Sequence, residues 1–156
     1  MSKTNNFKLV DFKIKNKANK EFIYGINISK IKEIINLPSI TKLPNVNKNI
    51  EGLIDLRGKT IPIINLISLL EKENSIEKKV LVANFNNIEI GFLIGEPRRI
   101  REINYKKIKT IKNQKKDSFI ISSTLLEDEN QLLLIIDLEI IIKNLGFLKI
   151  ENIPFV

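Results

Sequence analysis

The chain of 156 residues contains no cysteine, no histidine and no tryptophan, and only one methionine. The missing cysteine and histidine exclude zinc fingers, Cys–His nucleophiles, haem ligation and every triad that uses imidazole as its base. Disulfides are excluded as well, so folding depends on the core alone. With 43% hydrophobic residues, a chain of this length can bury enough apolar surface to fold without such links.

Long apolar runs are missing too, because every isoleucine-rich stretch is broken by Lys, Asn or Glu. None approaches the ~20 residues that cross a bilayer, so we expect no membrane insertion. The start, Met1-Ser2-Lys3-Thr4-Asn5-Asn6, lacks the apolar segment of a secretory signal, which favours a cytoplasmic location.

The sequence contains no recognised catalytic motif. There is no P-loop, no Gly-rich dinucleotide turn and no Gly-x-Ser-x-Gly elbow. The spacing of the 18 acidic residues selects no carboxylate pair of the glycosidase type. Ser122-Ser123-Thr124 has no evident base beside it in the sequence. We therefore predict a protein that is not an enzyme and has no cofactor and no metal site.

The positive charge is concentrated in one segment, residues 98–116. This segment holds nine basic residues against one acid, Glu102, and that excess of +8 equals the net charge of the whole chain. Its basic residues are Arg98, Arg99, Arg101, Lys106, Lys107, Lys109, Lys112, Lys115 and Lys116. A solvated lysine-rich loop is the favoured interpretation, followed by a site for an acidic protein, and then one for nucleic acid or anionic lipid. Proteins that bind single-stranded nucleic acid usually place aromatic rings among the basic residues, and this segment has only Tyr105. A nucleic-acid-binding small barrel is therefore kept as the second functional hypothesis and not the first.

Short strands dominate the hydrophobic pattern. Strands are predicted at Lys8–Ile14, Glu21–Gly25, Leu53–Arg57, Thr60–Ile64, Val80–Phe85, Ile88–Ile94, Arg99–Ile103, Phe119–Ser122 and Gln131–Ile135. Gly58-Lys59 predicts a two-residue type II′ hairpin. Asn86-Asn87 predicts a second hairpin, because asparagine tolerates positive φ.

Two short helices are predicted near the ends of the two halves. Asn65 can cap Leu66–Glu71, and Asp137 can cap Leu138–Asn144 with Gly146 just beyond as a stop signal.

Both helices belong to an internal repeat. Three pairs recur in the same order at offsets of 72, 69 and 66 residues: Ile61–Leu66 with Leu133–Leu138, Ile31–Ile34 with Ile100–Ile103, and Gly25 with Gly91. We interpret the pairs as a duplication, each copy being a meander of short strands closed by a helical turn. The predicted fold is mainly β, with two five-stranded barrels around one core. We place the first barrel at residues 15–78, the second at 79–145 with the N-terminal strand 7–14, and a tail at 146–156.

The stretch Phe22–Leu70 resembles the CheW family, the adaptors of bacterial chemotaxis arrays. The segments that carry the resemblance are Tyr24-Gly25-Ile26, Ile31-Lys32-Glu33-Ile34-Ile35, Ile40-Thr41-Lys42-Leu43-Pro44-Asn45, Ile50-Glu51-Gly52, Leu53-Ile54-Asp55-Leu56-Arg57-Gly58 and Lys59-Thr60-Ile61-Pro62-Ile63-Ile64-Asn65-Leu66. The resemblance implies that residues 1–156 form one domain of two SH3-like barrels, each with a short helix. It further implies a non-enzymatic adaptor, cytoplasmic and located at membrane-associated receptor arrays. The chain length leaves no room for an added receiver domain.

The resemblance also implies two binding sites. The cytoplasmic tip of a chemoreceptor would bind Ile31, Glu33 and Arg57, and the regulatory domain of the chemotaxis histidine kinase would bind Leu43, Asn45, Val46 and Ile50. Read from the residues alone, the alternative is that Arg57 is a surface arginine paired with Glu33 or Asp55. The apolar residues around Pro44 could equally close a barrel instead of binding a partner.

Overall fold

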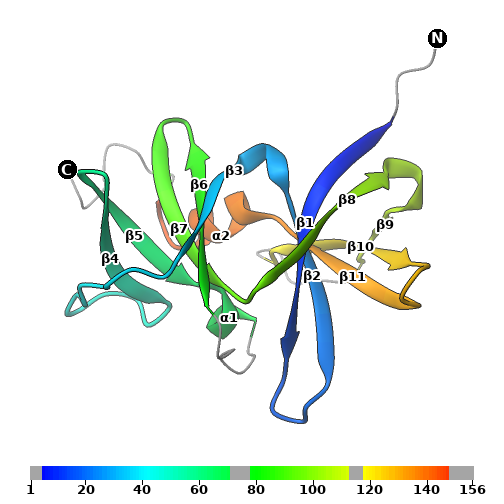
Figure 1. Ribbon diagram of the computed structural model, residues 1–156, viewed down its shortest axis with the longest axis horizontal. Helices are drawn as coiled ribbons and strands as arrows, with labels where there is room; N and C mark the ends of the chain where they lie inside the picture. Colours follow the sequence, from blue (N-terminus) through cyan, green and yellow to red (C-terminus); the bar gives the residue numbers. More distant parts are fainter. Residues whose placement is uncertain (1–4, 71–77, 113–117, 148–156) are drawn as a thin grey trace.

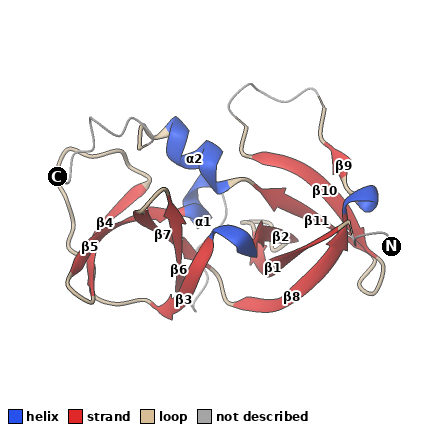
Figure 2. Cartoon of the chain, turned by 90° about the horizontal axis from the view of Figure 1, so that it is seen from above, coloured by secondary structure: helices blue, strands red, loops and turns tan. Residues whose placement is uncertain are grey.

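The computed structural model describes residues 5–70, 78–112 and 118–147, and its strands form two sheets that lie side by side (Figures 1 and 2). The strands are β1 (Asn6–Lys15), β2 (Glu21–Asn27), β3 (Ile31–Asn36), β4 (Ile50–Leu56), β5 (Lys59–Asn65), β6 (Lys79–Phe85), β7 (Ile88–Ile94), β8 (Pro97–Asn104), β9 (Lys109–Thr110), β10 (Ile120–Leu126) and β11 (Gln131–Ile136). The helical elements are η1 (Ile28–Lys30), α1 (Leu66–Leu69), η2 (Tyr105–Lys107) and α2 (Leu138–Asn144). The expected mainly β fold is confirmed.

The two sheets are called the first and second barrel here. The first barrel has the order β3-β6-β7-β5-β4, and a bridge between Thr41 and Leu53 extends its last edge. The second has the order β8-β1-β2-β11-β10-β9, so it contains six strands and not the expected five. The sixth, β9, is only two residues long and pairs with β10.

Apolar runs that do not alternate with polar residues are explained by burial on both faces. In β6, Val80 and Val82 point into the first barrel, whereas Leu81 and Ala83 belong to the core that the barrels share. In β2, Ile23 belongs to the interior of the second barrel. A strand buried on both sides has no solvated face, so its sequence is continuously apolar.

The shared core is the largest of the three apolar clusters. It combines residues of both barrels with residues of both helices, including Phe12, Tyr24, Phe92, Leu66 and Ile141. Burial raises the pKa of Tyr24 to about 12. Because this core contains side chains from both sheets, the barrels are joined by packing as well as by the chain.

The barrels exchange their first hairpins, and this corrects the expected division of the chain. β2 lies in the second barrel with β1, and β6 and β7 lie in the first barrel. A cut at residue 78 therefore separates the two sequence repeats but not the two sheets. The reason is that β2 pairs in parallel with β11, and β7 pairs in parallel with β5, each across the repeat boundary.

The matched glycines of the repeat occupy equivalent positions in these parallel pairs. Gly25 lies opposite Ile135, and Gly91 lies opposite Ile63. A methyl group at Gly25 would approach Leu133 Cδ2 to 2.8 Å, and one at Gly91 would approach Val80 Cγ1 to 2.9 Å. Both glycines thus allow side chains of neighbouring strands to fill the barrel interior, which supports the interpretation as a duplication.

The β4–β5 hairpin differs from the expected type. Leu56 pairs with Lys59, so the two turn residues are Arg57 and Gly58, with φ of 51° and 82°. Positive φ at both positions defines a type I′ turn in place of the predicted type II′. The second hairpin is as expected, with Asn86 and Asn87 both at positive φ.

The helix caps follow the predicted pattern. The Asn65 side chain accepts a hydrogen bond from Ser68 N, and Asp137 accepts hydrogen bonds from Glu139 N and Ile140 N. α1 ends at Leu69, before the predicted end at Glu71, which lies outside the described residues. Of the predicted tail 146–156, only the first two residues are described.

Candidate protein-docking sites

Arg57 and Glu33 form an ion pair at one end of the first barrel. Arg57 Nη1 donates to Glu33 Oε1 at 3.3 Å, and Arg57 Nη2 donates to Glu33 Oε2. The hydrogen bond from Arg57 and the charge of Glu33 raise the pKa of the guanidinium. The arginine side chain remains 61% exposed, because the type I′ turn holds it at the tip of the hairpin. The pairing considered from sequence is therefore present, and it leaves the arginine accessible to a partner.

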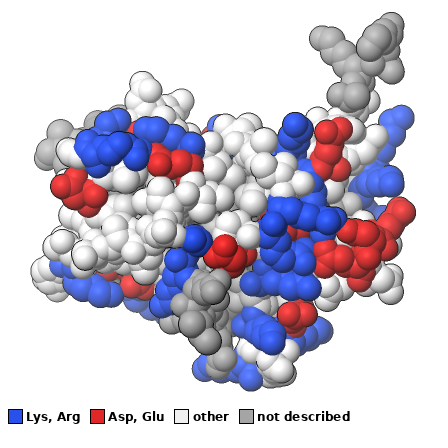
Figure 3. All heavy atoms as spheres, in the orientation of Figure 1, with Lys and Arg blue, Asp and Glu red and all other residues white. Residues whose placement is uncertain are grey.

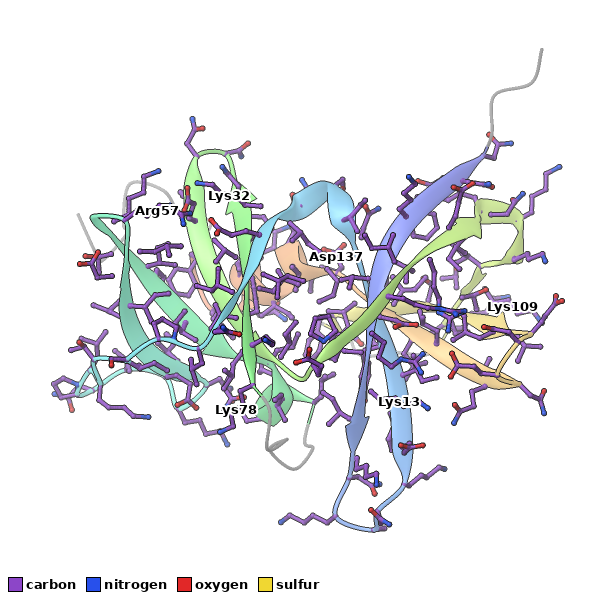
Figure 4. All side chains as sticks on the ribbon, in the orientation of Figure 1. Lys13, Lys32, Arg57, Lys78, Lys109 and Asp137 are labelled. Atoms are coloured by element: carbon purple, nitrogen blue, oxygen red, sulfur yellow. The ribbon has the colours of Figure 1, made fainter. Side chains whose placement is uncertain are left out.

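A second group of charges lies beside this pair. Lys32 Nζ is 2.7 Å and Lys59 Nζ is 3.2 Å from Glu89 Oε2, so strands β3, β5 and β7 are linked. The hydrogen bond from Lys32, opposed by burial and reinforced by Lys59, lowers the pKa of Glu89. Figure 4 shows Arg57 and Lys32 at the same end of the first barrel.

Ile31, the third predicted receptor residue, has a partly structural role. It lies opposite Ala83 in the β3–β6 ladder and packs against the shared core while remaining partly exposed. A register shift between Ile31 and Glu33 marks a bulge in β3. β3 thus carries an apolar and a charged side chain from the same edge strand, next to the arginine of the β4–β5 turn.

Three of the four residues predicted for kinase binding, Leu43, Val46 and Ile50, line an apolar cleft of about 450 Å³. We call it the α2 cleft, and it is lined by Leu43, Pro44, Val46, Ile50, Leu53, Leu145, Gly146 and Phe147. Val46 is 38% exposed, and among the described residues that line the cleft none is charged. Asn45 is exposed on the same loop with φ of 58° and does not line the cleft, so its contribution is to the turn.

The end of α2 builds the far wall of this cleft. Gly146, at φ of 88°, terminates the helix, with hydrogen bonds from Gly146 N to Lys143 O and from Phe147 N to Ile142 O. This pattern is a Schellman motif, which folds the residue after the glycine back onto the helix. Leu145 and Phe147 thereby reach the loop of the first repeat.

Leu53, Leu145 and Phe147 were not predicted as site residues. Leu53 reaches the cleft because its backbone exchanges hydrogen bonds of 2.8 and 2.9 Å with Thr41. Leu145 and Phe147 are about a hundred residues from the loop in sequence, and local patterns do not report such contacts. The only local sequence signal for this wall of the cleft was the helix-ending glycine followed by phenylalanine, Gly146-Phe147.

The basic segment is largely not a solvated loop, which corrects the favoured interpretation. Its first part is strand β8, and its arginines bind carboxylates. Arg98 Nη2 is 2.9 Å from Asp11 Oδ2, and Arg101 Nε also donates to this carboxylate. Asp11 is fully buried in β1, so it requires cationic partners of this kind.

The β10–β11 hairpin supplies the remaining carboxylates of this arginine cluster. Arg98 donates to both oxygens of Glu129 at 2.9 Å, and Asp128 binds Arg99 and Arg101. Figure 3 shows the resulting adjacent positive and negative surfaces over β8 and the hairpin. Three guanidinium charges are thus balanced by Asp11, Asp128 and Glu129. The residues best suited to contact phosphates are engaged within the molecule.

Lysines carry the remaining charge of the segment. Lys107 lies 3.4 Å from Glu127, whereas Lys106, Lys109 and Lys112 form no ion pair with other residues of the described part of the chain. Lys115 and Lys116 lie outside the described residues.

The described part of the chain contains neither a metal site nor a bilayer-spanning helix. In residues 5–70, 78–112 and 118–147, no three acidic side chains are placed to hold a cation. No helix within those ranges is long and apolar enough to span a bilayer.

Two interlocked barrels with an exposed arginine and an apolar cleft define a binding module. The CheW-like domain family matches residues 9–145. Chemotaxis protein CheV3 of Helicobacter pylori is 36% identical over 154 residues, which cover 92% of this chain and 49% of that protein. Chemotaxis protein CheW of Bacillus subtilis is 29% identical over 118 residues, covering 73% of this chain and 76% of that protein. The solved scaffolding protein TtCheW from Thermoanaerobacter tengcongensis has the same fold, with a TM-score of 0.70 at 23% identity over 84% of this chain and 88% of that one.

The chain belongs to the CheW-like domain family. The resemblance noted from the sequence is thus confirmed at the level of the family, and the curated relatives named above are chemotaxis proteins. The chain spans about half the length of the Helicobacter relative. The nucleic-acid hypothesis gains no support from these relatives.

Proposed function

We propose that the chain couples chemoreceptors to the chemotaxis histidine kinase, with the receptor tip at Ile31, Glu33 and Arg57 and the kinase regulatory domain at the α2 cleft. It acts in the cytoplasm and joins the membrane-associated array through these partners alone. The observation that carries the proposal is the gathering of Leu43, Val46 and Ile50 in one uncharged cleft. A partner that fills the cleft buries apolar side chains that the monomer leaves accessible.

The receptor site depends on an ion pair that a partner can open at little cost. Exposed ion pairs are screened by water and contribute little to stability, so a receptor carboxylate or backbone oxygen can compete with Glu33 for the guanidinium. The first barrel contributes residues to both sites. A receptor that changes the conformation of this barrel can therefore change the affinity for the kinase.

Two variants separate the sites. Arg57→Glu should weaken binding to a receptor-tip fragment and leave binding to the kinase regulatory domain intact, since Arg57 does not line the α2 cleft. Val46→Asp should do the reverse, because it places a charge in an apolar cleft. Calorimetric titrations with each purified partner provide the measurement, and circular dichroism confirms that each variant is folded.

Lys17→Glu, on the exposed β1–β2 turn, is the matched control for a change of charge. The site assignment is wrong if each variant weakens binding to both partners equally, or if neither variant weakens binding to the partner assigned to its site. The coupling function itself is wrong if the wild-type chain binds neither partner.

A further inference from the structure

The second barrel carries a cleft that the proposed function does not use. It has a volume of about 580 Å³ and lies between η1, the start of α2, and the strands β9 and β10. Its apolar lining includes Phe7, Tyr105, Ile108, Ile121, Ile135 and Leu138. We call it the β9 cleft.

Aromatic and aliphatic groups are exposed at this cleft. The rings of Phe7 and Tyr105 lie with their centroids 4.7 Å apart and form one wall. Tyr105 is nevertheless 55% exposed and Ile121 is 37% exposed. Large apolar side chains that line a concave surface are typical of a binding site, whereas scattered exposed ones are not.

The charged residues that line the cleft are already engaged. Lys30 Nζ lies 3.0 Å from Glu139 Oε1, so this pair is neutral. Asp137 uses its carboxylate to cap α2, accepting from Glu139 N at 2.9 Å. Asp137 therefore keeps one negative charge at the α2 end of the cleft.

The free charge at the rim is positive. Lys106 follows Tyr105, and Lys109 lies between Ile108 and Thr110, two residues of the lining. Both lysines are exposed and, among the described residues, neither has an ion-pair partner. Figure 4 shows Lys109 on the second barrel, well away from Asp137 at the junction of the barrels. Because strand alternation turns Lys109 away from the lining, its ammonium group belongs to the rim and not to the floor.

We propose that the β9 cleft binds an acidic protein segment that inserts apolar side chains. The apolar floor accepts the inserted side chains, and Lys106 and Lys109 attract the flanking carboxylates. β9 is the last strand of its sheet and is two residues long, so an extended segment can also pair with its open edge. This proposal does not rest on receptor or kinase binding, since neither of those sites includes the cleft.

Edge protection is the alternative role for the same lysines. Lysine on an edge strand discourages pairing with other chains. In that role the lysines would repel partners generally and would add nothing to the affinity for an acidic peptide.

A short peptide provides the direct test. The probe is a capped hexapeptide, Asp-Glu-Leu-Phe-Asp-Glu, titrated into the ¹⁵N-labelled full chain and followed by amide shifts. We expect saturable shifts at Tyr105, Ile108, Ile121 and Ser122. Two control peptides replace the acids by lysine or the Leu-Phe pair by Ser-Ser, and both should bind more weakly.

Variants of the protein then test the rim and the floor separately. Lys106→Glu combined with Lys109→Glu should lower the affinity for the probe peptide roughly fivefold or more, because two attractions to its carboxylates become repulsions. The control is Lys15→Glu combined with Lys17→Glu, which makes the same change of net charge at the turn of the β1–β2 hairpin, the end far from the cleft. It should change the affinity for the probe by less than twofold, because salt screens charges at that distance. Ile121→Asp should abolish saturable shifts at the cleft.

Four results would overturn the proposal. The first is equal binding of the lysine peptide, and the second is a shift map outside the cleft. The third is equal weakening by the two double variants, which would show that net charge alone attracts the probe. Undiminished binding to the Lys106→Glu, Lys109→Glu variant would likewise assign these lysines to edge protection.

Discussion

Arg57 illustrates how one residue can be unfavourable for the fold and useful for the site. Its φ of 51° lies in the left-handed region, where non-glycine residues other than Asn and Asp are uncommon. The turn could be built more readily from Asn-Gly. The unfavourable backbone conformation is offset by the position that it gives the side chain. The turn presents the guanidinium at the end of the barrel, and Glu33 keeps it oriented.

At the same scale, Glu129 makes stability depend on pH. The hydrogen bond from Arg98, opposed by burial and reinforced by the charges of Arg98, Arg101 and Lys13, lowers the pKa of Glu129 from 4.5 to about 2. A lowered folded-state pKa stabilises the protein above the unfolded-state pKa, and this contribution is lost as pH falls toward the folded value. We expect the melting temperature to fall between about pH 4.5 and pH 2.

Glu129→Gln tests the assignment. The variant should melt lower than the wild type at pH 7, and its melting temperature should change less between pH 4.5 and pH 2. Thermal scans at several pH values, with Glu127→Gln as the exposed control, would measure the difference. Parallel pH curves for Glu129→Gln and the wild type would contradict the role of this carboxylate.

Among the elements, β7 depends on one small residue in its middle, Gly91. Gly91 has no space for a methyl group beside Ile63 and Val80, which both belong to the interior cluster of the first barrel. Gly91→Ala should lower the free energy of unfolding by about 1–3 kcal/mol, the usual cost of overpacking. Urea denaturation provides the measurement, with Thr60→Ala on the exposed part of β5 as the control.

The equivalent change at Gly25 should have a similar effect in the second barrel, because Leu9 and Leu133 occupy the corresponding space. A neutral result at both glycines would show that the neighbouring side chains move aside without cost. It would then remove the packing reason for the repeat of glycine at matched positions.

Elements were predicted well where the signal is local, and poorly where it is not. The alternation in β1, the Asn86-Asn87 turn and the Asp137 cap are readable because each depends on residues close in sequence. The arginine cluster is not readable, because Arg98 and Asp11 are 87 positions apart. The hairpin exchange depends on parallel pairing across the repeat boundary, which no local pattern reports.

The candidate sites show the same limit. Leu43, Val46 and Ile50 lie on one loop and could be grouped from sequence, whereas the wall formed by Leu145 and Phe147 comes from the other repeat. The ion pair of Arg57 with Glu33 was one of two pairings open from sequence, and only the register of the β4–β5 hairpin decides between them.

For the whole molecule, the exchanged hairpins predict a single unfolding event. A fragment of residues 1–77 contains β1 and β2 without their partners β8 and β11, and lacks β6 and β7 of the first barrel. It should therefore remain unfolded alone, while the full chain should unfold in one cooperative transition. Amide spectra of the fragment and calorimetry of the full chain would measure these two properties.

Complementation gives the stronger form of this test. Fragments 1–77 and 78–156, mixed after separate purification, should associate and recover dispersed amide resonances, because each supplies the hairpin that the other needs. A fragment that folds alone, or two calorimetric transitions in the full chain, would contradict the shared core.

The exchange has a consequence for how such a molecule can be assembled. Each repeat donates one hairpin and accepts one hairpin, so the chain is the single-polypeptide form of a swapped homodimer with an approximate two-fold axis through the shared core. A protein built from one repeat alone would have to dimerise to complete either barrel. Joining the copies removes that dependence on concentration, and it frees the equivalent faces of the two barrels to acquire different partners.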